Sequence, residues 1–269
     1  MSKDMSVYFS GKKLYGDDFT LDQITEWFRD EQEGFADLGA KDRQNYRYIH
    51  HQLNIRHGFA HFGTRRFRHA LGFGSAYGDE FMPIIRQIDF ITIIDPSDAF
   101  SKNKEINGVP CEYHKPNVDG SISFGNGSFD LITSLGVMHH IPNVSKVIRE
   151  CFRCLGTDGV MLIREPIVSM GDWTKPRSGL TKRERGIPLK IFEEIIRASG
   201  FTIKHKTLCF FPAIPKLLYK IGVAAYNNPT VTWLDEVLSR SFSWNIRYHR
   251  TNVLAKIGPA SAYFVLEKG

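Results

Sequence analysis

The sequence has little of what marks a secreted or membrane-spanning chain. It contains few cysteines for its 269 residues, which indicates a reducing compartment, and they are Cys111, Cys151, Cys154 and Cys209. No run of about 18 uncharged apolar residues occurs, so no transmembrane helix is expected. The first residues, MSKDMSVYFSGKK, also lack the apolar core of a signal peptide. We therefore expect a cytoplasmic protein.

Two patterns that could indicate metal binding are incomplete. Cys151 and Cys154 form a CxxC, but no second cysteine pair completes a zinc site, and their stretch is typical of a helix that packs in the core. His57 and His61 are spaced as on one helix face, but no glutamate completes an HExxH pattern. Together with His50 and His51 they are interpreted as surface or packing residues, and no metal site is predicted.

Positive charge is present but dispersed. The net charge of +6 favours contact with phosphates, nucleic acid or anionic membranes. No block of lysine and arginine resembles a nucleic-acid-binding tail. A slightly basic enzyme surface is the simpler interpretation, and a nucleic-acid partner is not expected.

The stretch from Arg68 to Ser97 has the pattern of a strand, a glycine turn, a helix, a second strand and an acid. The turn is Gly72-Phe73-Gly74-Ser75-Ala76, and Asp95 follows the strand predicted over 90–94. A glycine turn lets backbone N–H groups approach a ligand, and an acid at the end of the next strand can accept from ribose hydroxyls. The pattern predicts a nucleoside-binding unit, and a plain βαβ unit with a tight turn is the alternative.

Further strands are expected over about 109–114, 128–134 and 160–164, with a helix over about 143–155 before the last of them. Strands that alternate with helices predict an α/β fold with a parallel sheet, whose ligands bind at the C-terminal ends of the strands. The groups expected at that edge are Gly72 to Gly78, Asp95, the loop around Asp119, Leu135 to His140, and Glu165.

Residues 1–64 are expected to form an N-terminal helical cap. A capping box at Thr20 to Gln23 opens a helix through about Leu38, and a second helix is expected over about 41–56. Near the C-terminus, a helix over 189–199 and strands over about 201–211 and 260–268 surround an insertion, residues 212–259. Its apolar beginning, 210–226, suits a cap over the site, a contact in a homo-oligomer or a peripheral membrane contact.

From about Phe67 to Pro166 the order of motifs resembles the class I S-adenosylmethionine-dependent methyltransferases. Residues 72–76 match the glycine-rich motif, Asp95 the ribose-binding acid, 122–132 the run "LPF…sFDlV", 138–143 the segment "lHHvpd", and 150–159 the segment "E..RvLkPGG". The resemblance implies S-adenosylmethionine as cofactor. It also implies a Rossmann-like, doubly wound, seven-stranded sheet with the last strand antiparallel, formed by residues 65–211 and 260–269.

The resemblance also implies the binding residues of the cofactor. Gly72, Phe73, Gly74 and Ser75 would surround its amino-acid part, Asp95 its ribose and Pro96 its adenine. Asn117 or Asp119 would lie near the adenine amino group, and Ser134 and Leu135 beside the sulfonium.

Two departures from the family pattern concern the methionine end of the cofactor. Ala76 stands where the family has the third glycine of the motif. Ala70 stands two residues before the first glycine, where the family often has an acid. His69 or a residue of the N-terminal helices would then have to bind this end. A non-catalytic S-adenosylmethionine-binding module remains an alternative.

The predicted catalytic residues are His139, His140 and Glu165, because a hydroxyl acceptor must lose a proton and imidazole titrates near neutrality. The alternatives are that one histidine of the pair only holds its loop and that Glu165 orients the acceptor or caps a helix. The following loop, 166–189, is predicted to bind an anionic substrate through Asp172, Trp173, Arg177, Arg183 and Arg185. We expect O-methylation of a small, anionic or sugar-containing acceptor. The alternative is N- or C-methylation of a lipid, quinone or amine.

Overall fold

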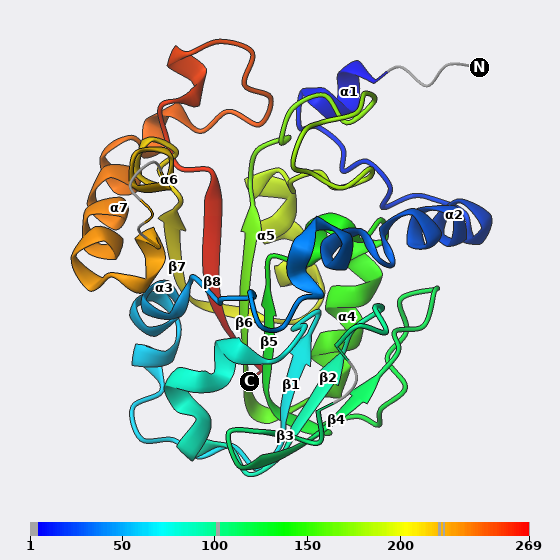
Figure 1. Cartoon of the computed structure of the whole chain (residues 1–269). Helices are drawn as coiled ribbons and strands as arrows, with labels where there is room; N and C mark the ends of the chain where they lie inside the picture. Colours follow the sequence, from blue (N-terminus) through cyan, green and yellow to red (C-terminus); the bar gives the residue numbers. More distant parts are fainter. Residues whose placement is uncertain (1–4, 101–102, 220–221, 223, 269) are drawn as a thin grey trace.

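Eight strands form one mixed sheet in the order β3-β4-β2-β1-β5-β6-β8-β7 (Figure 1). The chain is represented by a computed structural model that describes residues 5–100, 103–219, 222 and 224–268. The strands are β1 (Ala70–Phe73), β2 (Ile91–Ile94), β3 (Glu105–Ile106), β4 (Val109–His114), β5 (Phe129–Leu135), β6 (Leu155–Pro166), β7 (Thr202–Cys209) and β8 (Ser261–Glu267).

The pairing of the strands confirms the predicted Rossmann-like topology. β4, β2, β1, β5 and β6 are parallel, and β8 is inserted antiparallel between β6 and β7. The sheet has one strand more than predicted because the short β3 pairs antiparallel with β4 at the edge. The parallel strands end at one edge of the sheet, where ligands bind in this topology.

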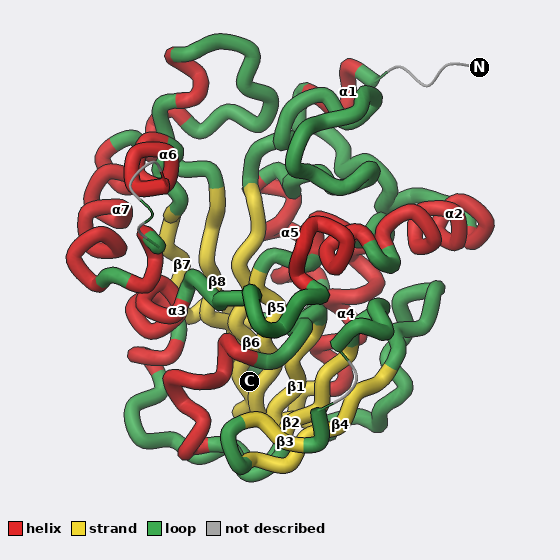
Figure 2. The backbone as a smooth tube through the Cα atoms, viewed as in Figure 1, coloured by secondary structure: helices red, strands yellow, loops and turns green. Residues whose placement is uncertain are grey.

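Helices cover both faces of the sheet, as Figure 2 shows. The α-helices are α1 (Ser6–Phe9), α2 (Leu21–Glu31), α3 (His51–His57), α4 (Val144–Cys154), α5 (Leu189–Ala198), α6 (Ala213–Tyr219) and α7 (Pro229–Ser241). A π-helical turn spans Ala36–Ala40, and 3₁₀ helices span Phe59–His61, Asp79–Gln87, Met138–His140, Ala225–Asn227, Ser243–Asn245 and Leu254–Lys256. The last three and the helices α6 and α7 lie between β7 and β8.

The two largest apolar clusters lie one on each face of the sheet, and a third, smaller one includes Ala76, Tyr77 and Phe100. α4 and α5 bury Val147, Ile148 and Phe192 on one face. α3 and the 3₁₀ helix Asp79–Gln87 bury Leu53 and Phe81 on the other face, where α6 and α7 also pack. All four cysteines are buried and free, as the interpretation of Cys151 and Cys154 as core residues requires. Along the described ranges of the chain, no helix combines the length and hydrophobicity needed to cross a membrane.

The N-terminal prediction is only partly correct. The capping box is confirmed, since Thr20 N donates to Gln23 Oε1 at 3.0 Å and Thr20 Oγ1 accepts from Gln23 N at 3.5 Å. The predicted helix 41–56 is correct only over 51–56, because helix α3 begins at His51 and residues 46–50 have no regular secondary structure. Tertiary contacts explain the difference: Tyr46 packs on Tyr77 with ring centroids 5.2 Å apart, and Tyr48 Oη accepts from Asn54 at 2.7 Å.

His57 and His61 do not share a helix face. Helix α3 ends at His57. The next residue, Gly58, packs against β8, and a Cβ there would collide with Tyr263. His57 is buried, whereas His61 is exposed with its ring 4.4 Å from that of His205. The packing interpretation therefore suits His57.

Candidate active site

The glycine turn between β1 and the 3₁₀ helix Asp79–Gln87 has the tight backbone that its sequence predicts. Gly74 has a φ of +69°, and a Cβ there would collide with the side chain of Val137. A Cβ on Gly72 would lie 2.5 Å from Ser75 Oγ. Ala76, which replaces the third glycine, keeps the left-handed conformation with a φ of +49°. The substitution therefore leaves the turn in a glycine-like conformation.

Asp95 follows β2 and contacts this turn. Its Oδ2 accepts from Ala76 N at 3.1 Å, and its Oδ1 accepts from Ser97 N at 3.0 Å. Burial raises the pKa of Asp95 to about 6, although both N–H groups favour the ionised form. The carboxylate is thus available as an acceptor at neutral pH.

A cavity of about 640 Å³ opens beside Asp95, within the usual size of a small-molecule site. Gly74, Ser75, Ala76, Asp95 and Pro96 line one side of it, and Glu31, His139, His140, Arg164 and Glu184 also line it. A second, apolar cleft of about 100 Å³ adjoins it and shares Gly74, Pro96 and Val137 with it. A close-approach turn, an acid and an apolar cleft are the features that a nucleoside bearing an amino-acid tail requires, so these residues fit S-adenosylmethionine.

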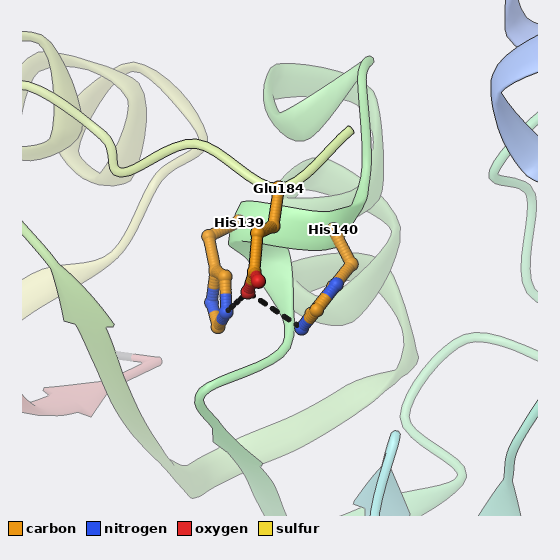
Figure 3. Close-up of side chains that lie close together, drawn as sticks. All are labelled: His139, His140 and Glu184. Carbon is orange, nitrogen blue, oxygen red and sulfur yellow. Dashed lines mark ion pairs between the residues drawn. The ribbon is translucent and has the colours of Figure 1, made fainter. Parts of the chain in front are cut away.

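The two neighbouring histidines belong to a network with three carboxylates. His139 Nδ1 lies 2.7 Å from Glu165 Oε2, and His140 Nδ1 lies 2.8 Å from Glu31 Oε2. Both Nε2 atoms face Glu184 Oε2, at 3.3 Å for His139 and 3.6 Å for His140 (Figure 3). We call His139, His140 and Glu184 the His–Glu cluster. Glu31 comes from α2 and Glu184 from the loop after β6, so three distant segments build this network.

The charges in this network depend on one another. Burial lowers the pKa of His139, but Glu165 and Glu184 outweigh burial and raise it to about 9. Burial and the neighbouring His139 lower the pKa of His140. Burial alone would raise the pKa of Glu165 and Glu184, yet both are lowered because each faces His139. The two histidines therefore differ in basicity although they are adjacent in sequence.

Glu165 lies behind His139 and orients the turn that carries both histidines. It is fully buried and accepts from Val137 N and Met138 N at 2.8 Å and from His139 N at 3.2 Å. It is not among the residues that line the cavity. Its position is that of a residue acting through His139.

Comparison with known proteins places the chain in a family. Residues 46–206 match the family model described as a methyltransferase domain. The chain belongs to this family. S-adenosylmethionine is accordingly its cofactor, and the protein is an S-adenosylmethionine-dependent methyltransferase.

Solved structures show the same fold at low sequence identity. The [4+2]-cyclase SpnF is 16% identical over 93% of this chain and 97% of that chain, with a TM-score of 0.57. YcgJ from Bacillus subtilis is 15% identical over 81% and 97%, with a TM-score of 0.51. A candidate sarcosine dimethylglycine methyltransferase from Galdieria sulphuraria is 15% identical over 98% and 97%, also at 0.51. No significant match is found among curated proteins. Because one of these neighbours is a cyclase, the fold leaves the acceptor open.

The predicted substrate loop, 166–189, borders the cavity through other residues than those singled out in the sequence. The five residues singled out there do not line the cavity. Its wall in this loop is formed by Pro166, Val168, Met170, Gly179, Leu180 and Glu184. Arg177 donates to three carbonyls of its own loop, and Arg183 forms ion pairs with Glu26 and Asp30 of α2. Trp173 stacks on Phe9, and Asp172 accepts from Thr174. These contacts hold the loop in place.

Arg185 is the least accessible of the five. It is fully buried, and its guanidinium donates to the carbonyl oxygens of Tyr15, Met138, His139, Ile141 and Pro142. These carbonyls belong mostly to the segment that carries the two histidines. Arg185 therefore stabilises the backbone that carries His139 and His140, and it does not line the cavity.

Of the other residues predicted to contact the cofactor, some line the cavity or the apolar cleft and some do not. Leu135 lines it, whereas Ser134 is buried in β5 beneath it. Asn117 lines the apolar cleft, and Asp119 accepts from Ser121 and Lys146, which hold its pKa below the usual range. His69 is not suited to the methionine end of the cofactor: it precedes β1, at the opposite edge of the sheet, and contacts Thr92.

Several cavity residues were not predicted from the sequence, and among the charged ones are Glu31, Glu80, Arg164 and Glu184. Glu80 is buried beside the glycine turn, where Thr133 Oγ1 donates to it at 3.3 Å, and burial raises its pKa to about 7. The Asp79-Glu80 pair after Gly78 was its only signal in the sequence. Arg164 Nη1 is buried at the cavity with no protein hydrogen-bond partner among the described residues.

Proposed function

We propose that this methyltransferase methylates a hydroxyl group of a small acceptor that carries an anionic group. One observation supports this above all: a single cavity joins the residues that suit the cofactor to the His–Glu cluster. A hydroxyl acceptor needs a group that takes up its proton, and imidazole and carboxylate groups serve this purpose.

The proposed cofactor contacts follow the family motifs. Gly72, Phe73, Gly74 and Ser75 would surround the amino-acid part, Asp95 the ribose and Pro96 the adenine. Asn117 or Asp119 would approach the adenine amino group, and Ser134 and Leu135 the sulfonium. When bound, the cofactor supplies a methyl group activated by its positive sulfur.

The methionine end would face Glu80 in place of the acid missing at Ala70. Glu80 lines the cavity next to Ser75 and is 3% exposed. A carboxylate there can accept from an ammonium group, and the ammonium would favour its ionised form. This assignment accounts for the departure from the family pattern at Ala70.

In the proposed reaction, the acceptor oxygen forms a bond to the methyl carbon while the carbon–sulfur bond breaks and its electron pair stays on sulfur. The hydroxyl proton passes to the network around the His–Glu cluster. The protein aligns the two reactants, which alone accounts for much of the acceleration of a displacement reaction.

The anionic group of the acceptor would be bound by Arg164. Its Nη2 donates to Leu135 O at 3.1 Å and its guanidinium lies 5.2 Å from the Phe210 ring, which leaves Nη1 for a ligand. A buried arginine with an unused donor favours carboxylate or phosphate. Arg164 thus takes the role that the sequence assigned to Arg177, Arg183 and Arg185.

Methylation of an amine or of a carbon in a lipid or quinone is the second candidate. It is favoured by the apolar part of the cavity wall, which includes Phe35, Leu38, Ile49 and Phe210. A sugar-containing acceptor would instead present several hydroxyls to the same wall.

The test is to incubate small-molecule extracts with the protein and methyl-labelled cofactor, and to identify labelled products by mass spectrometry. We expect an O-methylated anionic product. Arg164→Gln should raise the KM for that acceptor by about 10- to 100-fold, as loss of a hydrogen bond to a charged group predicts. Arg68→Gln is the matched control, because Arg68 is exposed at the opposite edge and pairs with Asp130. Products methylated only on nitrogen or carbon would refute the proposal, and cofactor binding without any product would indicate a non-catalytic module.

A further inference from the structure

The His–Glu cluster brings together three side chains that can each offer a ligand atom to a cation. An ionised carboxylate only accepts hydrogen bonds, so the Nδ1 atoms beside Glu165 and Glu31 must both carry hydrogen and donate. A neutral imidazole protonated on Nδ1 has a lone pair on Nε2. In that neutral form each Nε2 would present its lone pair on the side where Glu184 Oε2 lies, so the three atoms could share one cation. Without an ion, the raised pKa of His139 leaves its Nε2 protonated and donating to Glu184.

The carboxylate of Glu184 is held in one orientation by its own loop. Its Oε1 accepts from Thr181 N at 2.7 Å, which fixes the carboxylate and leaves Oε2 toward the histidines. Glu31 is fixed similarly, since it accepts from Thr181 Oγ1 at 2.5 Å and from Arg183 N at 2.6 Å. Glu184 is buried and cannot turn into solvent.

The distances suit a bridging ion better than a shared proton. A charge-assisted N–H···O bond measures about 2.7–2.9 Å, and the two contacts to Glu184 Oε2 are longer, at 3.3 and 3.6 Å. Bonds of about 2.0–2.1 Å from a tetrahedral cation would separate its ligand atoms by about 3.4 Å. The ligand atoms of His139, His140 and Glu184 all lie within 4.8 Å of one another.

The charges around the His–Glu cluster also favour a bound cation. Glu31, Glu165 and Glu184 are three buried or nearly buried carboxylates, and Arg185 is the buried cation beneath them. If an ion replaces the Nε2 proton of His139, both histidines are neutral, and three carboxylates with one arginine leave two negative charges that burial makes costly. One divalent cation would neutralise them.

We propose that His139 Nε2, His140 Nε2 and Glu184 Oε2 bind a divalent first-row transition-metal ion, with zinc as the best-suited member. Two histidines and one glutamate are a donor set of catalytic zinc sites, which keep their fourth position open. Glu165 and Glu31 are the outer carboxylates that orient such histidines through Nδ1. All three ligands line the cavity, so the open position faces the acceptor.

The ion would have a direct consequence for methyl transfer, and this consequence rests on the proposed function. An acceptor hydroxyl bound at the open position would lose its proton more readily, because a metal ion lowers the pKa of a bound oxygen. Glu31, which lines the same cavity and does not bind the ion, would take up that proton. The ion would also hold that oxygen in place for attack on the methyl carbon. Ion binding itself does not depend on which acceptor is used.

The test measures ion binding directly in protein stripped with a chelator. Isothermal titration with Zn²⁺, and the visible absorption of added Co²⁺, should show one tetrahedral ion per chain in the wild type. Glu184→Gln should weaken binding by at least 100-fold. Glu165→Gln should weaken it by about 10- to 100-fold, the usual effect of losing an outer carboxylate.

The control variant is His61→Asn, which removes the exposed His61–His205 pair as a competing surface site and should leave binding unchanged. Binding of S-adenosylhomocysteine shows whether each variant is folded. If Glu184→Gln does not fold, the Co²⁺ spectrum of the wild type still decides. Less than one ion per chain, an octahedral Co²⁺ spectrum, or equal affinity in folded Glu184→Gln would overturn the proposal.

The outcomes also separate the ion site from the proposed function. An ion bound as expected, with no O-methylated product from any extract, leaves the ion site intact and refutes the function. O-methylation that persists unchanged with chelator, in protein that binds no ion, supports the function and refutes the ion site.

Discussion

Replacing Arg185 by methionine should destabilise the protein strongly although this arginine does not line the cavity. Its three shortest hydrogen bonds go to the carbonyls of Tyr15 at 2.8 Å, Ile141 at 2.9 Å and Pro142 at 3.1 Å. Methionine fills similar space but donates nothing, so these carbonyls lose a donor inside the protein. Each buried polar group left unpaired costs about 1–3 kcal/mol, and breaking a buried charged network costs about 3–5 kcal/mol in total.

We therefore expect the free energy of unfolding to fall by about 4 kcal/mol. For a chain of this size, 1 kcal/mol shifts the melting temperature by about 2–4 °C, so Tm should fall by roughly 10 °C. Thermal unfolding followed by circular dichroism measures this shift.

Arg183→Met is the matched control in the same loop. Arg183 pairs with Glu26 and Asp30, and its side chain is 21% exposed, so its loss should cost about 1 kcal/mol or less. If the two variants melt within about 2 °C of each other, the carbonyl contacts of Arg185 do not stabilise the segment, and the reasoning fails.

Two further predictions concern the cofactor. Burial raises the pKa of Asp95 to about 6. In the proposed cofactor contacts, only the ionised carboxylate could accept from both ribose hydroxyls. Affinity for S-adenosylhomocysteine should thus be constant above pH 6 and fall by up to about tenfold per pH unit below it. Titration calorimetry tests this, and Asp95→Asn should bind weakly without the pH dependence; an equal slope in both proteins would contradict the assignment. Gly74→Ala should weaken the same binding at least tenfold, because its Cβ would collide with Val137 at a left-handed φ. Gly63→Ala, also at positive φ but with nothing within 4 Å, should bind normally, and equal loss in both would point to general unfolding.

Much of the fold could be predicted from local pattern. The apolar runs of β2, β5 and β6 and the glycine turn before Asp79 are encoded by adjacent residues, because strand burial and positive φ are local requirements. The predicted helix 41–56 failed before His51 for the opposite reason. Its first residues have helical spacing, but Tyr46 and Tyr48 are held by Tyr77 and Asn54, and these contacts override helix propensity.

By itself the sequence determined the frame of the site: the turn at Gly72 and Gly74, the acid at Asp95, and the position of His139 and His140 after β5. Only the tertiary structure decided which charges those histidines meet. Glu31 arrives from α2 and Glu184 from the loop after β6, while Arg185, one residue further, points the opposite way into the core. Backbone geometry depends on neighbours in the chain, whereas the pairing of buried charges depends on how distant segments pack, and no local pattern records that.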